Sequence, residues 1–459
     1  MDRVDITTLS LIGVIALAAL FDFTNGFHDS ANSIATVVAT RVLTPRVAVA
    51  WAAGWNFVAF FIVGTAVADT VGETVNRRFY SIAVVFAALL AAVIWNFFSW
   101  HFGIPTSSSH ALIGGLVGAA LVKGGIDAIR ASSVEKTAAF IVISPIAGLI
   151  FGGAMMLLLR ALLFRARVVR TERAFRYLQL VSSGAISLAH GGNDAQKTMG
   201  VIAGLLVATG HLHQSGGTLP VPDWVALGCY LFIALGTLTG GWSIVRTMGS
   251  GITKLRPVSG FCAETGAAIA LFGSTALGAP VSTTHTVAGS VAGVGTTNRN
   301  STVDWSVFRK MAVAWVVTMP AAAVVAAIVY GLTQLPGRAL SIIVLGVLIA
   351  GLLVLLWKSL RAAPRASDVE EDLDRQTEEE FPMLAGAGSI ISRRSASKRK
   401  LPHRHHREEQ SDSPTSAGGS PGSAKPEGPE LSARQLGVQR KFLEDAKAVT
   451  ADQAPQMSW

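Results

Sequence analysis

Long apolar stretches alternate along the chain with shorter stretches in which serine, threonine, glycine and charged residues interrupt the apolar pattern. A helix needs roughly 20 apolar residues to cross a hydrocarbon core about 30 Å thick. We predict membrane-spanning helices over residues 8–24, 47–68, 80–98, 137–163, 223–246, 258–277, 307–331 and 339–358. The first stretch has no small-residue cleavage site, so we interpret it as a membrane helix and not as a signal peptide.

Four shorter stretches are apolar but rich in small and hydroxyl-bearing residues. They lie near residues 25–40, 103–121, 182–208 and 278–295. Backbone N–H and C=O groups cannot stay unpaired in hydrocarbon, so a broken helix at that depth must be enclosed by protein or line a wet cavity. We therefore predict discontinuous or re-entrant helices at the membrane midplane in these four stretches.

The composition supports a membrane protein. The chain is 51% hydrophobic and 15% charged, with a mean hydropathy of +0.48. Its formal net charge is +9, but many of the lysines and arginines lie beside apolar stretches or in the tail, so membrane topology explains them better than nucleic acid. Cys229 and Cys262 lie in apolar stretches and provide neither a disulfide framework nor metal-ligand spacing.

The chain divides into five predicted segments. They are a first transmembrane repeat (1–160), a basic connection (161–177), a second repeat (178–335), a final transmembrane helix (336–360) and a hydrophilic tail (361–459). The positive-inside rule places the basic connection in the cytoplasm. The tail has too little apolar content to form a core, so we predict that it is disordered and cytoplasmic, either as a solvated extension or as a regulatory segment.

An internal repeat links the two halves. Residues 26–32 align with 191–197, which matches Asp29 with Asp194, and residues 103–118 align with 278–293 in the same order. Duplicated transporter halves show this pattern, with a binding site at their interface near the midplane. The alignment alone leaves open whether the halves are inverted or parallel.

Asp29 and Asp194 are carboxylates at membrane depth. An ionisable group there is costly unless it is paired or hydrated, so we interpret both as functional. Each can bind a cation or exchange a proton, and the neighbouring polar side chains can complete such a centre. In the alternative interpretation, each aspartate caps the end of a broken helix.

The second pair of motifs places hydroxyls after a proline, at Pro105 and Pro280. Proline suits the first turn of a helix, where outward-pointing N–H groups and the positive end of the dipole attract anions. Two such helix starts, facing each other, can enclose one phosphate. The predicted substrate-binding hydroxyls are those of Ser107, Ser108, Ser109, Ser282, Thr283 and Thr284. The alternative is that they only cap helices.

Other motif residues have several possible roles. His110 and His285 can contact substrate, relay a proton or pack in the interior. Lys197 can neutralise Asp194, attract the anion or extend to the membrane interface. Small residues let membrane helices approach closely, so we predict packing roles for Gly114, Gly118, Gly289 and Gly293.

Residues 25–41 and 189–200, with the two hydroxyl motifs, resemble the signatures of the inorganic phosphate transporter (Pit) family of bacteria, in a group that includes eukaryotic sodium–phosphate carriers. The resemblance covers about residues 20–335. It implies an all-α polytopic fold of two inverted repeats in the plasma membrane, usually dimeric, that carries phosphate with a cation. It also implies that Asp29, Asn32, Asp194 and Gln196 belong to the ion and substrate centre. Within this centre we predict substrate binding by Asn32 and Gln196 and ion coupling by Asp29 and Asp194. His28 and Asn193, which directly precede the aspartates, are further predicted coupling residues because their imidazole and amide groups can complete the site.

Sodium-coupled relatives commonly have asparagine directly before the first aspartate, where this chain has His28. The sequence resembles instead the bacterial branch thought to move a neutral metal–phosphate complex together with protons. We therefore predict proton rather than sodium coupling, no resident cofactor or metal, and a divalent metal as a candidate co-substrate. A sulfate carrier and an anion channel stay open as alternatives. An enzyme is not indicated, because the aspartate motifs differ from those of aspartic proteases and no HisGluXaaXaaHis pattern occurs.

Overall fold

The computed structural model describes residues 6–165, 168–214, 218–297, 303–336 and 364–380, with scattered positions between 343 and 361. The chain divides into a unit of residues 1–376 and a second unit, 377–459, of which only residues 377–380 are described. The described part is helical apart from turns and one isolated bridge, which confirms the all-α prediction. Most of the predicted final helix and the tail beyond residue 380 lie outside the described residues.

The helices of the first half are α1 (Ile6–Ala39), α2 (Pro45–Val58), α3 (Ala66–Gly72), α4 (Ile82–His101), α5 (Ser108–Gly124) and α6 (Ala131–Leu163), with short 3-10 helices η1 (Ala59–Phe61), η2 (Arg77–Phe79) and η3 (Gly125–Ala128). The second half contains α7 (Val168–Ala208), α8 (Asp223–Thr239), α9 (Trp242–Ser250), α10 (Pro257–Ala276), α11 (Thr283–Thr297) and α12 (Trp305–Thr333). Within the described residues, five helices are long and apolar enough to cross a membrane, or up to seven if each bent helix pair is one span.

Both aspartate motifs lie inside continuous helices. α1 has 34 residues and α7 has 41, so the predicted breaks at 25–40 and 182–208 are wrong. The chain bends elsewhere, by 89° between α2 and α3 and by 75° between α8 and α9, in stretches predicted to be uninterrupted. Side chains of the long helices satisfy the backbone at these bends, because Val67 N donates to Gln196 Oε1 (2.8 Å) and Gly241 N donates to Ser30 Oγ (2.6 Å).

The two hydroxyl motifs follow sharp turns, as predicted for stretches 103–121 and 278–295. α4 and α5 form one hairpin and α10 and α11 form another, and the turns contain Gly103 and Gly278, both with φ of +62°. Glycine adopts this conformation without the clash that a Cβ would cause. Thr247 of α9 donates to the carbonyl of Gly103 and Thr70 of α3 to that of Gly278, each at 2.8 Å. The short helix after each bend therefore holds the hairpin turn of the other half.

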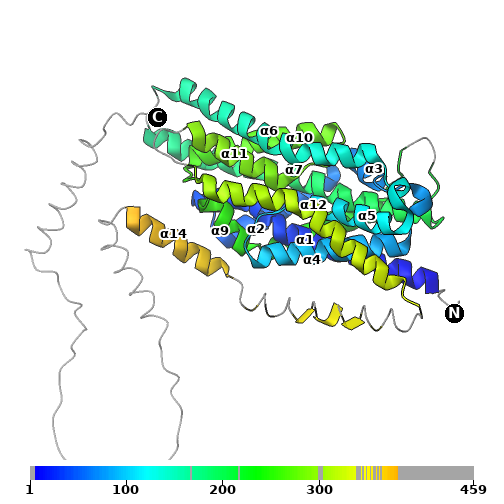
Figure 1. Cartoon of the computed structure of the whole chain (residues 1–459). Coiled ribbons are helices and arrows are strands. Elements are labelled where there is room, and N and C mark those ends of the chain that lie inside the picture. The colour runs from blue at the N-terminus through cyan, green and yellow to red at the C-terminus, as the bar shows by residue number, and fades with distance from the viewer. Residues whose placement is uncertain are drawn as a thin grey trace, which may run out of the picture. The chain divides into compact units, whose positions relative to one another are not determined.

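The second helix of each hairpin packs against a long helix of the other half, α5 against α12 and α11 against α6 (Figure 1). A Cβ on Gly118 would lie 2.0 Å from the carbonyl oxygen of Ala323, and a Cβ on Gly293 would lie 2.2 Å from that of Leu149. Gly114 and Gly289, one turn earlier in α5 and α11, are similarly close to the facing helices. The predicted packing role of these glycines is confirmed.

Part of the predicted disordered tail is helical. α14 (Ala366–Glu380) places Val369, 4% exposed, against the apolar core, and Leu373 packs nearby. Asp372 pairs with Arg246 (2.6 Å) and Asp374 pairs with Arg41 (2.9 Å). An apolar pair four residues apart forms a small face on an otherwise acidic helix, which explains how this segment docks despite its polar composition.

Candidate functional site

Asp29 lies beside the starts of α5 and α11, the second helices of the two hairpins. Its carboxylate accepts a hydrogen bond from Ser108 of α5 (2.8 Å) and a longer one from Thr284 of α11 (3.5 Å). Asp29 is only 2% exposed. The first predicted coupling residue therefore contacts the hydroxyl motifs of both halves.

Asp194 lies in the same buried centre and is fully buried. It forms an ion pair with Lys197, one turn along α7, and His190 Nε2 lies 3.3 Å from its second oxygen. Thr283 donates to that oxygen at 3.4 Å. The two aspartates thus share one enclosed region with the starts of α5 and α11.

The residues before the aspartates tie α1 and α7 to the hairpins. His28 Nδ1 lies 2.6 Å from Asp29 Oδ1, and His28 Nε2 lies 2.9 Å from Ser99 Oγ on α4. Asn193 donates to Thr275 Oγ1 on α10 at 2.9 Å. Each residue therefore bonds the first helix of the hairpin of its own half, and His28 also contacts Asp29.

Of the two predicted amides, one reaches the centre. Asn32 Nδ2 donates to both Thr283 and Thr284 at 3.0 Å. Gln196 instead uses its oxygen for Val67 N and its nitrogen for the carbonyl of Gly192 (2.5 Å). Its amide supports the bend before α3, so the structure does not bring Gln196 together with the other predicted substrate residues.

The hydroxyls divide into two groups. Ser107 accepts from His110 N (3.2 Å) and Ser282 accepts from His285 N (3.3 Å), so these two serines cap the starts of α5 and α11. The remaining four predicted hydroxyls, those of Ser108, Ser109, Thr283 and Thr284, bond to residues of α1 or α7. The capping alternative therefore describes the first hydroxyl of each motif, and the others face the aspartate centre.

His110 and His285 lie behind the hydroxyls, fully buried, with ring centroids 4.8 Å apart. His285 stacks on Trp315 of α12 at 4.2 Å, and Trp315 Nε1 donates to the carbonyl of Pro105 (3.0 Å). These contacts link the two hairpins to each other and to α12, which favours the packing role for both histidines.

The sequence interpretation missed two other buried carboxylates. Asp22 accepts a hydrogen bond from Thr198 of α7. Glu264 of α10 accepts hydrogen bonds from Thr36 (2.6 Å), Gln179 (3.0 Å) and Ser182. A periodic signal was available, because one face of α1 carries a polar stripe at spacings of three and four residues that consists of Asp22, Asn25, Asp29, Asn32 and Thr36.

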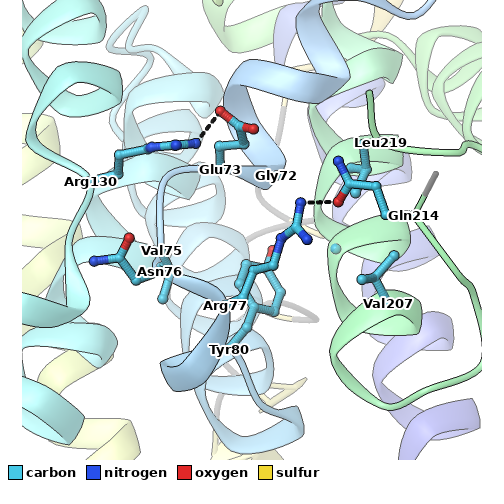
Figure 2. Close-up of a pocket in the computed structure, with 11 residues that line it drawn as sticks. Gly72, Glu73, Val75, Asn76, Arg77, Tyr80, Arg130, Val207, Gln214 and Leu219 are labelled. Carbon is cyan, nitrogen blue, oxygen red and sulfur yellow. Dashed lines mark hydrogen bonds and ion pairs between the residues drawn. The ribbon is translucent and has the colours of Figure 1, made fainter. Parts of the chain in front are cut away.

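A separate cavity of about 240 Å³ lies outside this centre, between the α3–η2 connection and the end of α7 (Figure 2). Arg77 and Arg130 line it, and both are already engaged, Arg77 with Gln214 and Arg130 with Glu73. None of the predicted site residues lines this cavity.

The centre has the donor set for a divalent metal. One ligand atom each from Asp29, His190 and Asp194 all lie within 4.8 Å of one another. Carboxylate oxygens and imidazole nitrogens are common ligands of divalent metals. The residues therefore fit a divalent metal ion.

The sequence profile of the PHO4 phosphate transporter family matches residues 25–326, a region that contains both aspartates and both hairpins. The chain belongs to the phosphate transporter family. It is 53% identical over 321 residues to a probable low-affinity inorganic phosphate transporter of Rhizobium meliloti, covering 70% of this chain and 95% of the relative. A protein of Bacillus subtilis with the same name is 40% identical over 330 residues, covering 71% and 98%.

A solved structure described as the sodium-dependent phosphate transporter matches with a TM-score of 0.66 and 24% identity, over 71% of this chain and 99% of that chain. At this identity the match shows a shared fold. The relatives are named as transporters and not as enzymes, in agreement with the sequence. Family membership and the apolar helices together make this chain a multi-pass membrane protein.

Proposed function

We propose that this family member carries inorganic phosphate through the membrane, coupled to the movement of a cation. The relatives in Rhizobium meliloti and Bacillus subtilis are named for this substrate. The observation that carries the proposal is the buried centre in which Asp29 and Asp194 meet the hydroxyl-bearing starts of α5 and α11. Asp29 contacts both helix starts, whereas Asp194 contacts the start of α11 and is linked to the start of α5 through Lys197.

The arrangement suits a tetrahedral oxyanion that arrives with its own positive partner. The first turns of α5 and α11 offer backbone N–H groups, dipoles and hydroxyls to phosphate oxygens. Asp29 and Asp194 would repel a bare anion. Phosphate can donate its own proton to a carboxylate, which favours phosphate over sulfate, the second candidate with the same geometry.

We further propose that protons supply the coupling and that phosphate travels as a neutral complex with a divalent metal. Asp29, His190 and Asp194 are grouped closely enough to bind the metal of such a complex. The metal ion of such a complex would be attracted by the aspartates, which would repel bare phosphate. The remaining elements of the proposal are two halves of inverted topology, a homodimer, a plasma-membrane location and a cytoplasmic tail.

Uptake of radiolabelled phosphate into proteoliposomes tests the proposal. We expect saturable uptake that a proton gradient and a divalent metal stimulate and that excess sulfate leaves unchanged. Asp29→Asn and Asp194→Asn should each abolish uptake, whereas Asp127→Asn, an exposed carboxylate of η3, should not. Full uptake by both centre variants would contradict the site. Uptake that never saturates would instead indicate a channel, and competition by sulfate would indicate a general oxyanion carrier.

A further inference from the structure

Lys197 is a cation enclosed in the centre. Its side chain is 1% exposed, although it belongs to a helix that crosses the apolar part of the molecule. The ammonium group contacts Asp194 Oδ1 on α7, Ser109 Oγ on α5 and the backbone carbonyl of Val281 (2.8 Å) just before α11. Three oxygens from three different elements therefore surround one positive charge.

These contacts decide between the roles that the sequence left open. An ammonium group has three N–H donors, and three oxygen acceptors occupy all of them here. No N–H remains to bind an incoming anion, and a buried side chain does not extend to the membrane interface. The position of Lys197 fits the neutralisation of Asp194.

The oxygens around Lys197 are also those that bind a small hard cation. Such ions take carboxylate, hydroxyl and backbone carbonyl oxygens, which are the three types present here. The aligned position in the first half of the chain is Asn32, which carries no charge and donates to Thr283 and Thr284. One difference between the two halves is therefore the presence of a covalently attached cation at the second aspartate.

We infer that the ammonium group of Lys197 occupies the position of a monovalent coupling cation at Asp194, so that the second half of the centre works without a bound sodium ion. This inference rests on the proposed phosphate transport. It makes Lys197 the residue that determines cation specificity. Phosphate uptake by the natural protein is then independent of sodium because the positive charge is already in place.

Two substitutions of Lys197 separate the effect of its positive charge from the effect of the volume that its side chain fills. Lys197→Ser removes the ammonium group, leaves room for an ion and adds an oxygen ligand, whereas Lys197→Met fills the space without charge or ligand. We expect Lys197→Ser to lose most uptake in choline buffer and to regain it as sodium replaces choline at constant ionic strength. Lys197→Met should stay inactive at every sodium concentration. Lys123→Ser, near the end of α5, is the control and should behave like the natural protein.

A second readout does not depend on transport. Sodium should raise the apparent melting temperature of detergent-solubilised Lys197→Ser in a concentration-dependent way, since a ligand that binds the folded state stabilises it. Neither the natural protein nor Lys197→Met should respond.

Absence of any stabilisation or rescue of Lys197→Ser by sodium, lithium or potassium, in a preparation whose natural protein takes up phosphate, would overturn the inference. Sodium stimulation of the natural protein would overturn it as well, and this test holds even if Lys197→Ser does not fold. Failure of the natural protein to take up phosphate under any condition would contradict the proposed function instead.

Discussion

The packing of each hairpin against the opposite half should tolerate no added methyl group. In Gly118→Ala the new Cβ would lie 2.0 Å from the carbonyl oxygen of Ala323, and in Gly293→Ala it would lie 2.2 Å from that of Leu149. Real Cβ atoms essentially never lie closer than 3.0 Å to such an atom, so the helices must separate by about 1 Å. The obstructing atoms are backbone atoms of α12 and α6, which cannot move aside as a flexible side chain could.

The expected cost follows from two opposing contributions. Overpacking of a close contact destabilises by about 1–3 kcal/mol, and alanine in place of glycine in a helix gains roughly 1 kcal/mol. Because the contact is short and involves backbone, we expect a net loss of about 2 kcal/mol, or roughly 2–4 °C in apparent melting temperature for a folded unit of this size. Gly13→Ala in α1 is the matched control, since nothing lies within 4 Å of its Cβ. It should keep or raise the melting temperature.

Thermal unfolding of the purified variants in detergent, together with phosphate uptake after reconstitution, gives the comparison. Gly118→Ala and Gly293→Ala should both fall below the natural protein in melting temperature and in uptake. If either variant were as stable as Gly13→Ala, the close packing of α5 on α12 or of α11 on α6 would be refuted.

Three further predictions concern other parts of the structure. Asp22→Asn keeps an oxygen for the hydrogen bond from Thr198 but cannot release a proton, so uptake should lose its stimulation by a proton gradient; an unchanged response would exclude Asp22 from coupling. The Ser306 hydroxyl and the backbone N–H groups of Val307 and Ser306 hold the pKa of Asp304 below its usual value. The stabilisation that Asp304 gives to the start of α12 is therefore complete at neutral pH and is lost as the pH falls below about 3.9. A pH series of melting temperatures should show this loss of stability, and Asp304→Asn should not show it. Val369→Ala removes two buried carbons worth about 1.6 kcal/mol and should increase hydrogen–deuterium exchange over residues 366–376, whereas loss of the exposed Asp374 carboxylate should change exchange little.

The sequence was sufficient to predict those parts of the buried centre that occur in both halves of the chain. Asp29 and Asp194 are rare charges in apolar surroundings, and Pro105 and Pro280 mark the hydroxyl motifs. Their order in both halves predicted their convergence, and the structure brings them together. Repetition carries this information because two copies of a costly polar motif rarely persist for packing alone.

The positions of the helix breaks could not be predicted in this way. Polar residues in the aspartate motifs suggested broken helices, yet α1 and α7 are continuous because their side chains bond across to neighbouring helices. The bends after α2 and α8 lie in apolar stretches, where side chains of Gln196 and Ser30 supply the missing acceptors from far along the sequence. Such tertiary partners leave no local pattern.

Single residues without a repeated copy were also missed. Glu264 lies in a stretch that hydropathy alone assigns as an ordinary span, and its partners Gln179 and Ser182 come from α7. Gln196 shows the opposite error. Its motif suggested contact with substrate, but its side-chain amide oxygen accepts a hydrogen bond from the backbone at the start of α3. In both cases the direction of a side chain, which the sequence does not encode locally, determines its role.

One phosphate should bind between the start of α5 and the start of α11, beside Asp29 and Asp194. An experimental structure determined in phosphate tests this most directly. We expect tetrahedral density within hydrogen-bonding distance of Ser108 and Thr284, and none after Asp29→Asn. Phosphate density in the Arg77 and Arg130 cavity alone, with the hairpin centre filled only by water, would contradict it.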